Sequence, residues 1–289
     1  MSREPTGLAL YDQTAQDAAA AVISAYSTSF GLATRLLGPR PRPHVRNIYA
    51  LVRIADEIVD GPAAAAGLDA RSERGVLDDL ETETLAAIER GFSANLIVHA
   101  FARTARECGI GSDLIEPFFA SMRTDLSTAR HDAASHDDYV YGSAEVVGLM
   151  CLQVFVNAGS GHPVPAPADL VDGARRLGAA FQDVNFLRDQ GHDEDALGRD
   201  YLGLTSGRTS RAQVLDTIDA DLAAAAAVIY RLPADCRRAV TAAHDLFAAL
   251  SARLRENSTP GRRVRVPDAV KATLAARAWL GFAPRRNPS

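Results

Sequence analysis

The sequence predicts an all-α protein, and three observations support that fold class. The 289 residues are rich in alanine, while β-branched and aromatic residues are not dominant, which favours helices over strands. Apolar residues recur at helical spacing in about ten segments, and alternating strand patterns are scarce. Short stretches rich in Gly and Pro separate these segments, as expected of helices joined by short links.

The helical segments are each bounded by turn residues. The first is predicted at 14–37 and ends at Gly38-Pro39, and the second is predicted at 45–59 and ends at Gly61-Pro62. Further helices are predicted at 76–90, 95–108, 114–129, 137–157, 168–190, 212–230, 234–255 and 267–280. We expect a loop at 158–167, where three prolines occur, and an irregular segment at 191–210.

One domain is predicted over residues 16–280, because short links favour a single helical bundle. The two acidic motifs described below lie on either side of the loop at 158–167, so we do not place a domain boundary there. Residues 1–15 are predicted to be a flexible N-terminal segment, and residues 281–289 a basic C-terminal tail.

The composition excludes several classes of protein. A net charge of −5 argues against a nucleic-acid partner, and 47% hydrophobic with 23% charged residues excludes a mainly disordered chain. The three cysteines are far apart and form no CxxC pair, which argues against a disulfide framework or a structural zinc site. The polar N-terminus lacks a signal-peptide pattern, and no run of 18 apolar residues occurs, so a cytoplasmic location is expected.

The first acidic motif is Asp56-Glu57-Ile58-Val59-Asp60. Asp56 and Asp60 are four residues apart and share one face of the predicted helix, where like charges repel. Arg53 lies one turn earlier and can offset part of that repulsion, but it cannot neutralise both carboxylates. A solvated acidic helix end explains this motif alone about equally well.

The second acidic motif extends from Gln182 to Asp193. Asn185, Asp189 and Asp193 recur at intervals of four, and Gln182 precedes Asn185 by three, so a continuous helix would place four oxygen-bearing side chains in one stripe. The alternative is the polar outer face of an amphipathic helix. Gly191 weakens the continuous-helix assumption near Asp193.

Together, the two motifs indicate a metal site. Carboxylate and amide oxygens suit hard divalent cations such as Mg²⁺, and Mn²⁺ is an alternative. Mg²⁺ completes its coordination with water and substrate phosphates, so two carboxylate pairs facing a helical cavity would hold a diphosphate. No P-loop or Rossmann glycine motif is present to bind the phosphates instead.

A third segment, Tyr139 to Cys151, places Tyr139, Ser143 and Val147 on one predicted helix face. Ala144 and Gly148 form a pair of small residues four apart, which lets another helix or a long apolar ligand approach the backbone. Ordinary helix packing is the simpler of these two explanations.

These motifs, taken together, resemble the squalene/phytoene synthase family of head-to-head prenyl transferases. The resemblance covers the chain from Tyr26 to about Trp279, and its pieces occur in family order: Tyr26-Ser27-Thr28-Ser29-Phe30, Arg53 with Asp56–Asp60, Tyr139–Gly148, Gln182–Asp193 and Gly198-Arg199-Asp200-Tyr201-Leu202. The resemblance implies a single-domain class I isoprenoid-synthase helical bundle around a central apolar cavity.

The resemblance also implies roles for individual residues. The catalytic carboxylates would be Asp56, Asp60, Asp189 and Asp193, and together with Asn185 they would hold the metal. The substrate-binding residues would be Ser27, Ser29, Phe30, Arg53, Tyr139, Ser143, Val147, Gly148, Gln182, Asn185, Tyr201 and Arg263. Three departures affect the cavity: Ser143-Ala144-Glu145 replaces Val-Ala-Gly, Gly203 replaces a proline, and Leu246 or Phe247 stands where the family has a tyrosine.

The implied reaction is a Mg²⁺-dependent condensation of two geranylgeranyl diphosphates, through a cyclopropylcarbinyl diphosphate, to phytoene, the first step of carotenoid biosynthesis, without NADPH. The alternative is a C30 enzyme that makes squalene or dehydrosqualene from farnesyl diphosphate. A non-catalytic binding protein and a class I terpene cyclase are two further alternatives. The retained aspartates argue against the first, and the central Tyr-and-Gly element against the second.

The C-terminal segment mixes aromatic and basic residues between Arg277 and Arg286, as membrane-interfacial segments do. Peripheral contact with the inner face of a membrane is therefore an expectation for this chain. A packed last helix with a basic tail explains the same pattern equally well. The sequence does not indicate an oligomeric state.

Overall fold

The computed structural model describes residues 6–27, 29–127, 133–192, 202, 204, 207, 209–256 and 264–285. The helices of the N-terminal half are α1 (Leu8–Tyr26), α2 (Ser29–Arg35), α3 (Arg42–Val59), α4 (Pro62–Ala65), α5 (Ala70–Arg90), α6 (Leu96–Cys108) and α7 (Ser112–Asp125). The remaining elements are α8 (Ala133–Val140), the π-helical turn η1 (Tyr141–Glu145), α9 (Val146–Asn157), α10 (Ala168–His192), α11 (Arg211–Val228), the short 3₁₀ turn η3 (Ile229–Arg231), α12 (Ala234–Glu256) and α13 (Asp268–Trp279). The described elements are all helical, which confirms the predicted all-α class.

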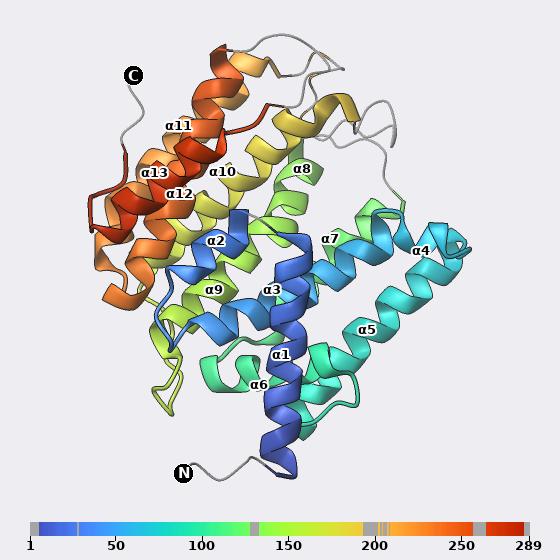
Figure 1. Cartoon of the computed structure of the whole chain (residues 1–289). Coiled ribbons are helices and arrows are strands. Elements are labelled where there is room, and N and C mark those ends of the chain that lie inside the picture. Colours follow the sequence, from blue (N-terminus) through green and yellow to red (C-terminus); the bar gives the residue numbers. More distant parts are fainter. Residues whose placement is uncertain are drawn as a thin grey trace.

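The helices form two packed groups, with the segment α8–η1–α9 between them (Figure 1). The helices α3, α5, α6, α7 and α9 enclose one hydrophobic cluster around Leu51, Phe101 and Phe118. The helices α10, α11 and α12 enclose a second cluster around Val184 and Ile218. Because η1 packs on α7 from one side and on α10 from the other, it joins the two groups.

The N-terminal helix begins earlier than the sequence predicted. α1 starts at Leu8, so residues 8–15 are helical and the predicted flexible segment 1–15 is wrong from that point. Two contacts explain the difference: the side chain of Ala15 is fully buried, and the Tyr11 hydroxyl donates a hydrogen bond to the backbone carbonyl of Ser93 at 2.8 Å. The predicted helix 14–37 is also interrupted, because Ser27 has an extended backbone between α1 and α2.

Side-chain caps set other helix starts. Asp69 accepts a hydrogen bond from the backbone N–H of Ser72, so α5 starts at Ala70 and includes a turn that the apolar pattern from residue 76 misses. Ser210 and Gln213 form a reciprocal capping box at the start of α11. These local hydrogen bonds satisfy backbone donors that the first turn of a helix leaves unpaired.

A π-helical turn interrupts the helix that was predicted as one regular element over 137–157. At this turn the backbone approaches α7 so closely that only glycine fits: a Cβ on Gly142 would lie 2.0 Å from Ser121 Oγ and 2.3 Å from the Pro117 carbonyl oxygen. On the other side, a Cβ on Gly178 of α10 would lie 2.8 Å from the Ala144 carbonyl oxygen. Glycines thus fix η1 between α7 and α10.

Within the described ranges, the helical segment His136–Asn157 is long and apolar enough to cross a membrane by length and composition. The same segment packs against α7 and α10 inside the bundle, and core helices pass the same test. No run of 18 consecutive apolar residues occurs in the sequence, and the contacts of this helix with α7 and α10 are those of a core helix.

Candidate active site

The first acidic motif lies at the C-terminal end of α3. Asp56 is half-buried and Asp60 is exposed, and the helix places them on one face as predicted. Desolvation raises the pKa of Asp56 to about 8, and the nearby charges of Asp60, Asp125 and Glu57 add to the increase, whereas Arg53 opposes it. Burial and the neighbouring carboxylates together therefore favour the protonated form of Asp56.

Arg53 is held beside this motif by two neighbours. Its guanidinium forms an ion pair with Glu57 one turn later, and it lies over the ring of Tyr26, 4.6 Å from the ring centroid. Its Nε is buried and has no hydrogen-bond partner among the described residues. Ser27 forms a side-chain hydrogen bond with Tyr49, which lies on α3 as Arg53 does. Two residues of the predicted substrate-binding set, Arg53 and Ser27, are therefore held at α3.

Asp125, at the end of α7, belongs to this site and was missed by the sequence analysis. The Tyr139 hydroxyl donates to the Asp125 carboxylate, with distances of 3.0 and 2.9 Å to its two oxygens, and the charge of Asp125 raises the pKa of Asp56. A lone aspartate at a helix end has no spacing pattern that would have distinguished it. The structure thus connects the predicted Tyr139 to the first acidic motif.

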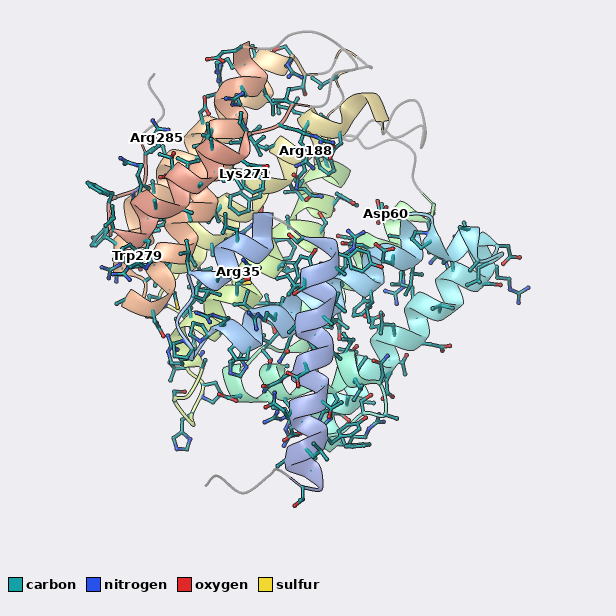
Figure 2. The ribbon with its side chains drawn as sticks, viewed as in Figure 1. Arg35, Asp60, Arg188, Lys271, Trp279 and Arg285 are labelled. Carbon is teal, nitrogen blue, oxygen red and sulfur yellow. The ribbon has the colours of Figure 1, made fainter. Side chains whose placement is uncertain are left out.

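The second acidic motif lies on α10, which continues through Gly191 to His192. Gln182, Asn185 and Asp189 are half-buried, and the guanidinium of Arg188 contacts the Asp189 carboxylate at 2.5 Å. Figure 2 labels Arg188 on this helix and Asp60 at the end of α3. Asp189 therefore has the guanidinium of Arg188 in direct contact, whereas Arg53 acts on the charge of Asp56 through space.

Tyr139 stands between the two motifs. It is buried, its hydroxyl bonds to Asp125, and its ring centroid lies 6.0 Å from that of Phe186, which precedes Asp189 by one turn of α10. The ring of His136 lies near the same phenylalanine, at 6.2 Å. Tyr139 therefore contacts Asp125 at the end of α7 and Phe186 of α10, and the charge of Asp125 acts through space on Asp56 of α3.

The other residues predicted for the cavity helix have different surroundings. The hydroxyl oxygen of Ser143 is buried and has no hydrogen-bond partner among the described residues, whereas Val147 packs on the first hydrophobic cluster. Gly148 faces α10, because a Cβ there would lie 2.8 Å from the Ala174 carbonyl oxygen. Glu145, the departure from the family pattern, forms an ion pair with Arg175 of α10. The small residues of this helix therefore serve helix packing.

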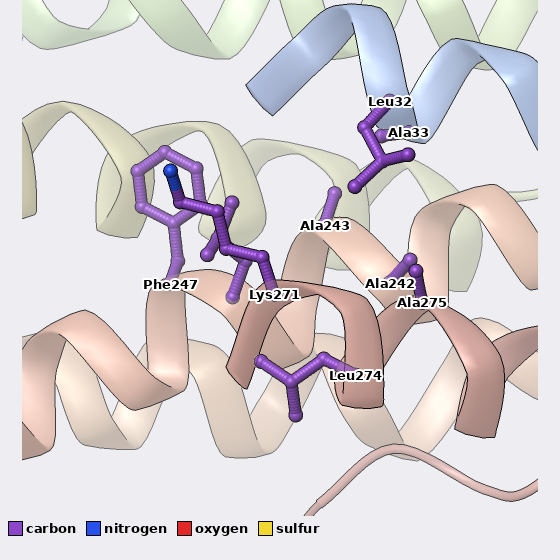
Figure 3. Close-up of a pocket in the computed structure, with 9 residues that line it drawn as sticks. Leu32, Ala33, Ala242, Ala243, Phe247, Lys271, Leu274 and Ala275 are labelled. Carbon is purple, nitrogen blue, oxygen red and sulfur yellow. The ribbon is translucent and has the colours of Figure 1, made fainter. Parts of the chain in front are cut away.

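An apolar groove lies between α2, α12 and α13 (Figure 3). Its lining residues are Leu32, Ala33, Ala242, Ala243, Leu246, Phe247, Lys271, Leu274 and Ala275. Phe247 stacks on Phe181 of α10 with ring centroids 3.8 Å apart, and Phe181 directly precedes Gln182. Leu246 and Phe247, which replace a family tyrosine, thus line an apolar groove next to the second acidic motif.

Several predicted residues cannot be placed. Asp193, Tyr201 and Arg263 lie outside the described residues, as do the side chains of Ser29 and Phe30. Within the described part of the chain, no three His, Cys, Asp or Glu side chains are grouped as a metal site. The donor set still fits a hard cation, because its oxygens come from carboxylates and an amide and because, besides burial, the neighbouring carboxylates add to the rise in the pKa of Asp56.

Comparisons with known proteins show the family to which the chain is related. The sequence model of a family described as squalene/phytoene synthase matches residues 23–206. A 15-cis-phytoene synthase of Paracoccus sp. (strain N81106 / MBIC 01143) is 28% identical over 272 residues, which cover 86% of this chain and 84% of that protein. A 15-cis-phytoene synthase of Synechocystis sp. is 33% identical over 189 residues, which cover 63% of this chain and 54% of the relative.

Solved structures share the fold. A dehydrosqualene synthase in complex with a ligand superposes with a TM-score of 0.75 at 22% identity, over 93% of this chain and 96% of that one. A squalene synthase from Alicyclobacillus acidocaldarius gives a TM-score of 0.71 at 18% identity, over 86% of this chain and 95% of that one. The matched region includes α3, α7, η1 and α10, on which the site is built. The chain belongs to the squalene/phytoene synthase family of prenyl transferases.

Proposed function

We propose that this protein is a phytoene synthase, which joins two molecules of geranylgeranyl diphosphate head to head. The observation that supports the proposal best is the position of Tyr139, which donates to Asp125, whose charge acts on Asp56, and which lies beside Phe186 on the helix of the second acidic motif. The phytoene synthases among the relatives favour the C40 product over the C30 alternative. This reaction would be the first step toward carotenoids. Because it ends with the loss of a proton, it requires no reductant, and NADPH is not expected as a cofactor.

Carboxylates from both acidic motifs would hold the metal that the family implies. Asp56 and Asp60 lie at the end of α3, Asn185 and Asp189 lie on α10, and Asp193, outside the described residues, is assigned from the sequence motif. Mg²⁺, with Mn²⁺ as a substitute, would supply positive charge that stabilises a diphosphate leaving group. The oxygen-only donor set and the high pKa of Asp56 support this assignment.

The chain's own residues would bind the diphosphates and line the apolar part of the site. Arg53, held by Glu57 and Tyr26, points a cation at the acidic end of α3, where a diphosphate would bind. We assign further polar contacts with substrate to Ser27, Ser29, Gln182, Tyr201 and Arg263. Walls of the prenyl site are assigned to Phe30, Tyr139 and Ser143, whereas Val147 and Gly148 would contribute by packing this helix against the first hydrophobic cluster and α10.

Departure of one diphosphate would leave an allylic cation, which the double bond of the second substrate attacks. Loss of a proton from the resulting cation then closes the three-membered ring of a cyclopropylcarbinyl diphosphate. The buried ring of Tyr139, next to Phe186, offers π electrons to a cation at this position. Apolar surroundings would exclude the water that otherwise quenches the cation. A second ionisation, rearrangement and proton loss complete the hydrocarbon.

The test is an incubation of the purified protein and Mg²⁺ with geranylgeranyl or farnesyl diphosphate, with and without NADPH, followed by mass analysis of the hydrocarbons. We expect a C40 hydrocarbon that forms without NADPH. A C30 product would favour the squalene or dehydrosqualene alternative, and a cyclised product from one substrate would indicate a terpene cyclase. Absence of any hydrocarbon from folded protein would favour a binding protein.

We propose a cytoplasmic location.

A further inference from the structure

The part of the chain that contains α2 and most of α3 is strongly cationic. Residues 18–55 contain five arginines and no acidic residue, although the whole chain has a net charge of −5. Two of the five are neutralised by carboxylates. Arg40 binds both carboxylate oxygens of Asp235, at 2.8 and 2.9 Å, and Arg53 forms an ion pair with Glu57. We call the remaining three the arginine cluster: Arg35, Arg42 and Arg46.

The fold brings the arginine cluster together where α2 packs on α3. Arg35 is the last residue of α2 and Arg42 is the first residue of α3, and Figure 2 labels Arg35 at this end of α2. The guanidinium of Arg42 donates to the backbone carbonyl of Arg35 at 3.1 Å and to that of Leu37 at 3.0 Å. These hydrogen bonds hold the charge of Arg42 at the end of α2. Arg46 follows one turn later on α3, about 6 Å along the helix axis.

The charges of the arginine cluster oppose one another. Burial lowers the pKa of the Arg46 guanidinium below its ordinary value, and the charges of Arg42 and Arg35 lower it further. The Nε of Arg46 is buried and has no hydrogen-bond partner within the described ranges. Like charges that are held close together are unfavourable unless a negative charge offsets them. The protein therefore holds three cations together without supplying the anion that would compensate them.

The helix α12, which packs on α2, does not supply this anion either. Before its last residue, Glu256, α12 has two acidic residues, and both have partners. Asp235 binds Arg40, and the buried Asp245 accepts a hydrogen bond from the backbone N–H of Arg285 at 2.7 Å. Because Arg238 precedes Ala242 of the apolar groove by four residues, it lies on the side of α12 that faces α2. The surroundings of the arginine cluster are therefore positive as well.

We propose that the arginine cluster is a binding site for a small phosphate-bearing anion, with free diphosphate as the occupant. The planar fork of N–H donors on a guanidinium matches two oxygens of one phosphate group. A carboxylate would neutralise one of the three charges, whereas a phosphate group carries about −1.5 to −2 at neutral pH. The site is separate from the acidic end of α3, because Arg46 precedes Asp56 by ten residues, about 15 Å along the helix.

Isothermal titration calorimetry of the full chain measures the binding, with sodium diphosphate, geranyl diphosphate and sodium acetate as separate titrants. Chelator is present and prenyl condensation is absent, so the result does not depend on the proposed function. Without a divalent cation, the acidic motifs repel these anions. We expect diphosphate to bind about tenfold more tightly than acetate, and added salt to weaken the binding. Absence of diphosphate binding, or equal affinity for acetate, would overturn the proposal.

The R46Q variant should bind diphosphate about tenfold more weakly than the wild type. R35Q changes an exposed side chain, so it keeps the test valid if R46Q does not fold, and it should weaken binding by a smaller factor. The matched control is R90Q, which removes the same charge from a residue paired with Glu83 on α5. In Figure 1, α5 and α2 lie on opposite sides of α1.

A second measurement distinguishes binding from a general effect of charge. Diphosphate should raise the melting temperature of the wild type and of R90Q, but not that of R46Q, because a ligand stabilises only the folded protein that binds it. Equal weakening of binding by R90Q and R46Q would contradict a local site. Unchanged binding in both R46Q and R35Q would also contradict it. Binding that depends on Arg46 only for geranyl diphosphate would overturn free diphosphate as the occupant.

Discussion

The two acidic motifs differ in how much of their charge the protein neutralises. On α3, Asp56 is surrounded by Asp60, Asp125 and Glu57, and its pKa is raised to about 8. On α10, the carboxylate of Asp189 contacts the guanidinium of Arg188 at 2.5 Å. At Asp56, burial and neighbouring carboxylates therefore outweigh the effect of Arg53, whereas Asp189 has a guanidinium in direct contact.

This difference indicates which half of the site depends more on an added cation. A carboxylate cluster that raises its own pKa is strained in the metal-free protein, because burial and repulsion both disfavour ionisation. Such strain is common where a site is built for a ligand rather than for stability. We infer that a divalent cation would stabilise the α3 motif more than the α10 motif.

The largest expected effect comes from neutralising one aspartate in each motif. Asp56→Asn and Asp189→Asn should each lower the rate of hydrocarbon formation by about a hundredfold to a thousandfold, because each removes charge that holds the leaving group. Their stabilities should differ. In chelator at pH 8, Asp56→Asn should raise the free energy of unfolding by about 2 kcal/mol, whereas Asp189→Asn should change it by less than about 1 kcal/mol.

Denaturant unfolding and product analysis on the same protein samples measure both effects. A control substitution, Asp172→Asn on the exposed start of α10, should leave the rate unchanged. If Asp56→Asn were destabilising in chelator, the contrast between the two motifs would be wrong. Full activity in either variant would remove that aspartate from the proposed site.

The next effect concerns η1, the turn that joins the two groups of helices. Gly142→Ala should destabilise the fold by about 3 kcal/mol or more, because a Cβ would lie 2.0 Å from Ser121 Oγ and 2.3 Å from the backbone oxygen of Pro117. The matched control is Gly75→Ala on α5, where a Cβ would have no atom within 4 Å. That substitution should stabilise by about 0.5–1 kcal/mol through helix propensity. Thermal unfolding of both variants gives the comparison, and similar melting temperatures would contradict it.

The pH dependence of stability sharpens the contrast. Asp56 keeps its proton up to a pH of about 8 in the folded protein, against an ordinary value of 3.8 in the unfolded chain. Folding therefore takes up a proton between these values, so the contribution of Asp56 to stability falls as pH rises from about 4 to about 8. Melting temperatures in chelator should show this loss in the wild type relative to Asp56→Asn. Parallel curves for the two proteins would contradict the raised pKa.

The smallest effect concerns the residue that links the two motifs. Tyr139→Phe removes the hydroxyl that bonds to Asp125, which should cost about 1–2 kcal/mol of stability. Asp125→Asn should move the pH dependence of Asp56 to lower values, because it removes a negative charge that raises the Asp56 pKa. The same melting experiment detects that shift. An unchanged pH profile would place Asp125 too far from Asp56 to matter.

Most of the fold could be predicted because helical periodicity and breakers are local signals. The ranges predicted at 95–108, 168–190 and 234–255 lie within two residues of α6, α10 and α12. Errors occurred where a start depended on contacts rather than pattern. α1 begins at Leu8 because Tyr11 reaches Ser93, and α5 begins at Ala70 because Asp69 caps it.

The site was predicted in part. Regular spacing identified Asp56, Asp60 and Asp189, since i and i+4 residues share a face on any regular helix. Asp125 was missed because its relation to Tyr139 is tertiary. The π-helical turn also escaped, because it changes the register within Tyr139–Val147, where a regular spacing was assumed. As a result, Ser143 has a buried hydroxyl while Val147 packs on the first hydrophobic cluster.

Lys271 is the one lysine in this arginine-rich sequence, and it lines the groove between α2, α12 and α13. Its ammonium contacts Asp268 at 3.1 Å, and its side chain is 26% exposed. Apart from the chain terminus, an amine-selective reagent would therefore have a single target in the whole molecule. A fluorophore or photocrosslinker attached there would report directly from the groove, with no engineered attachment site.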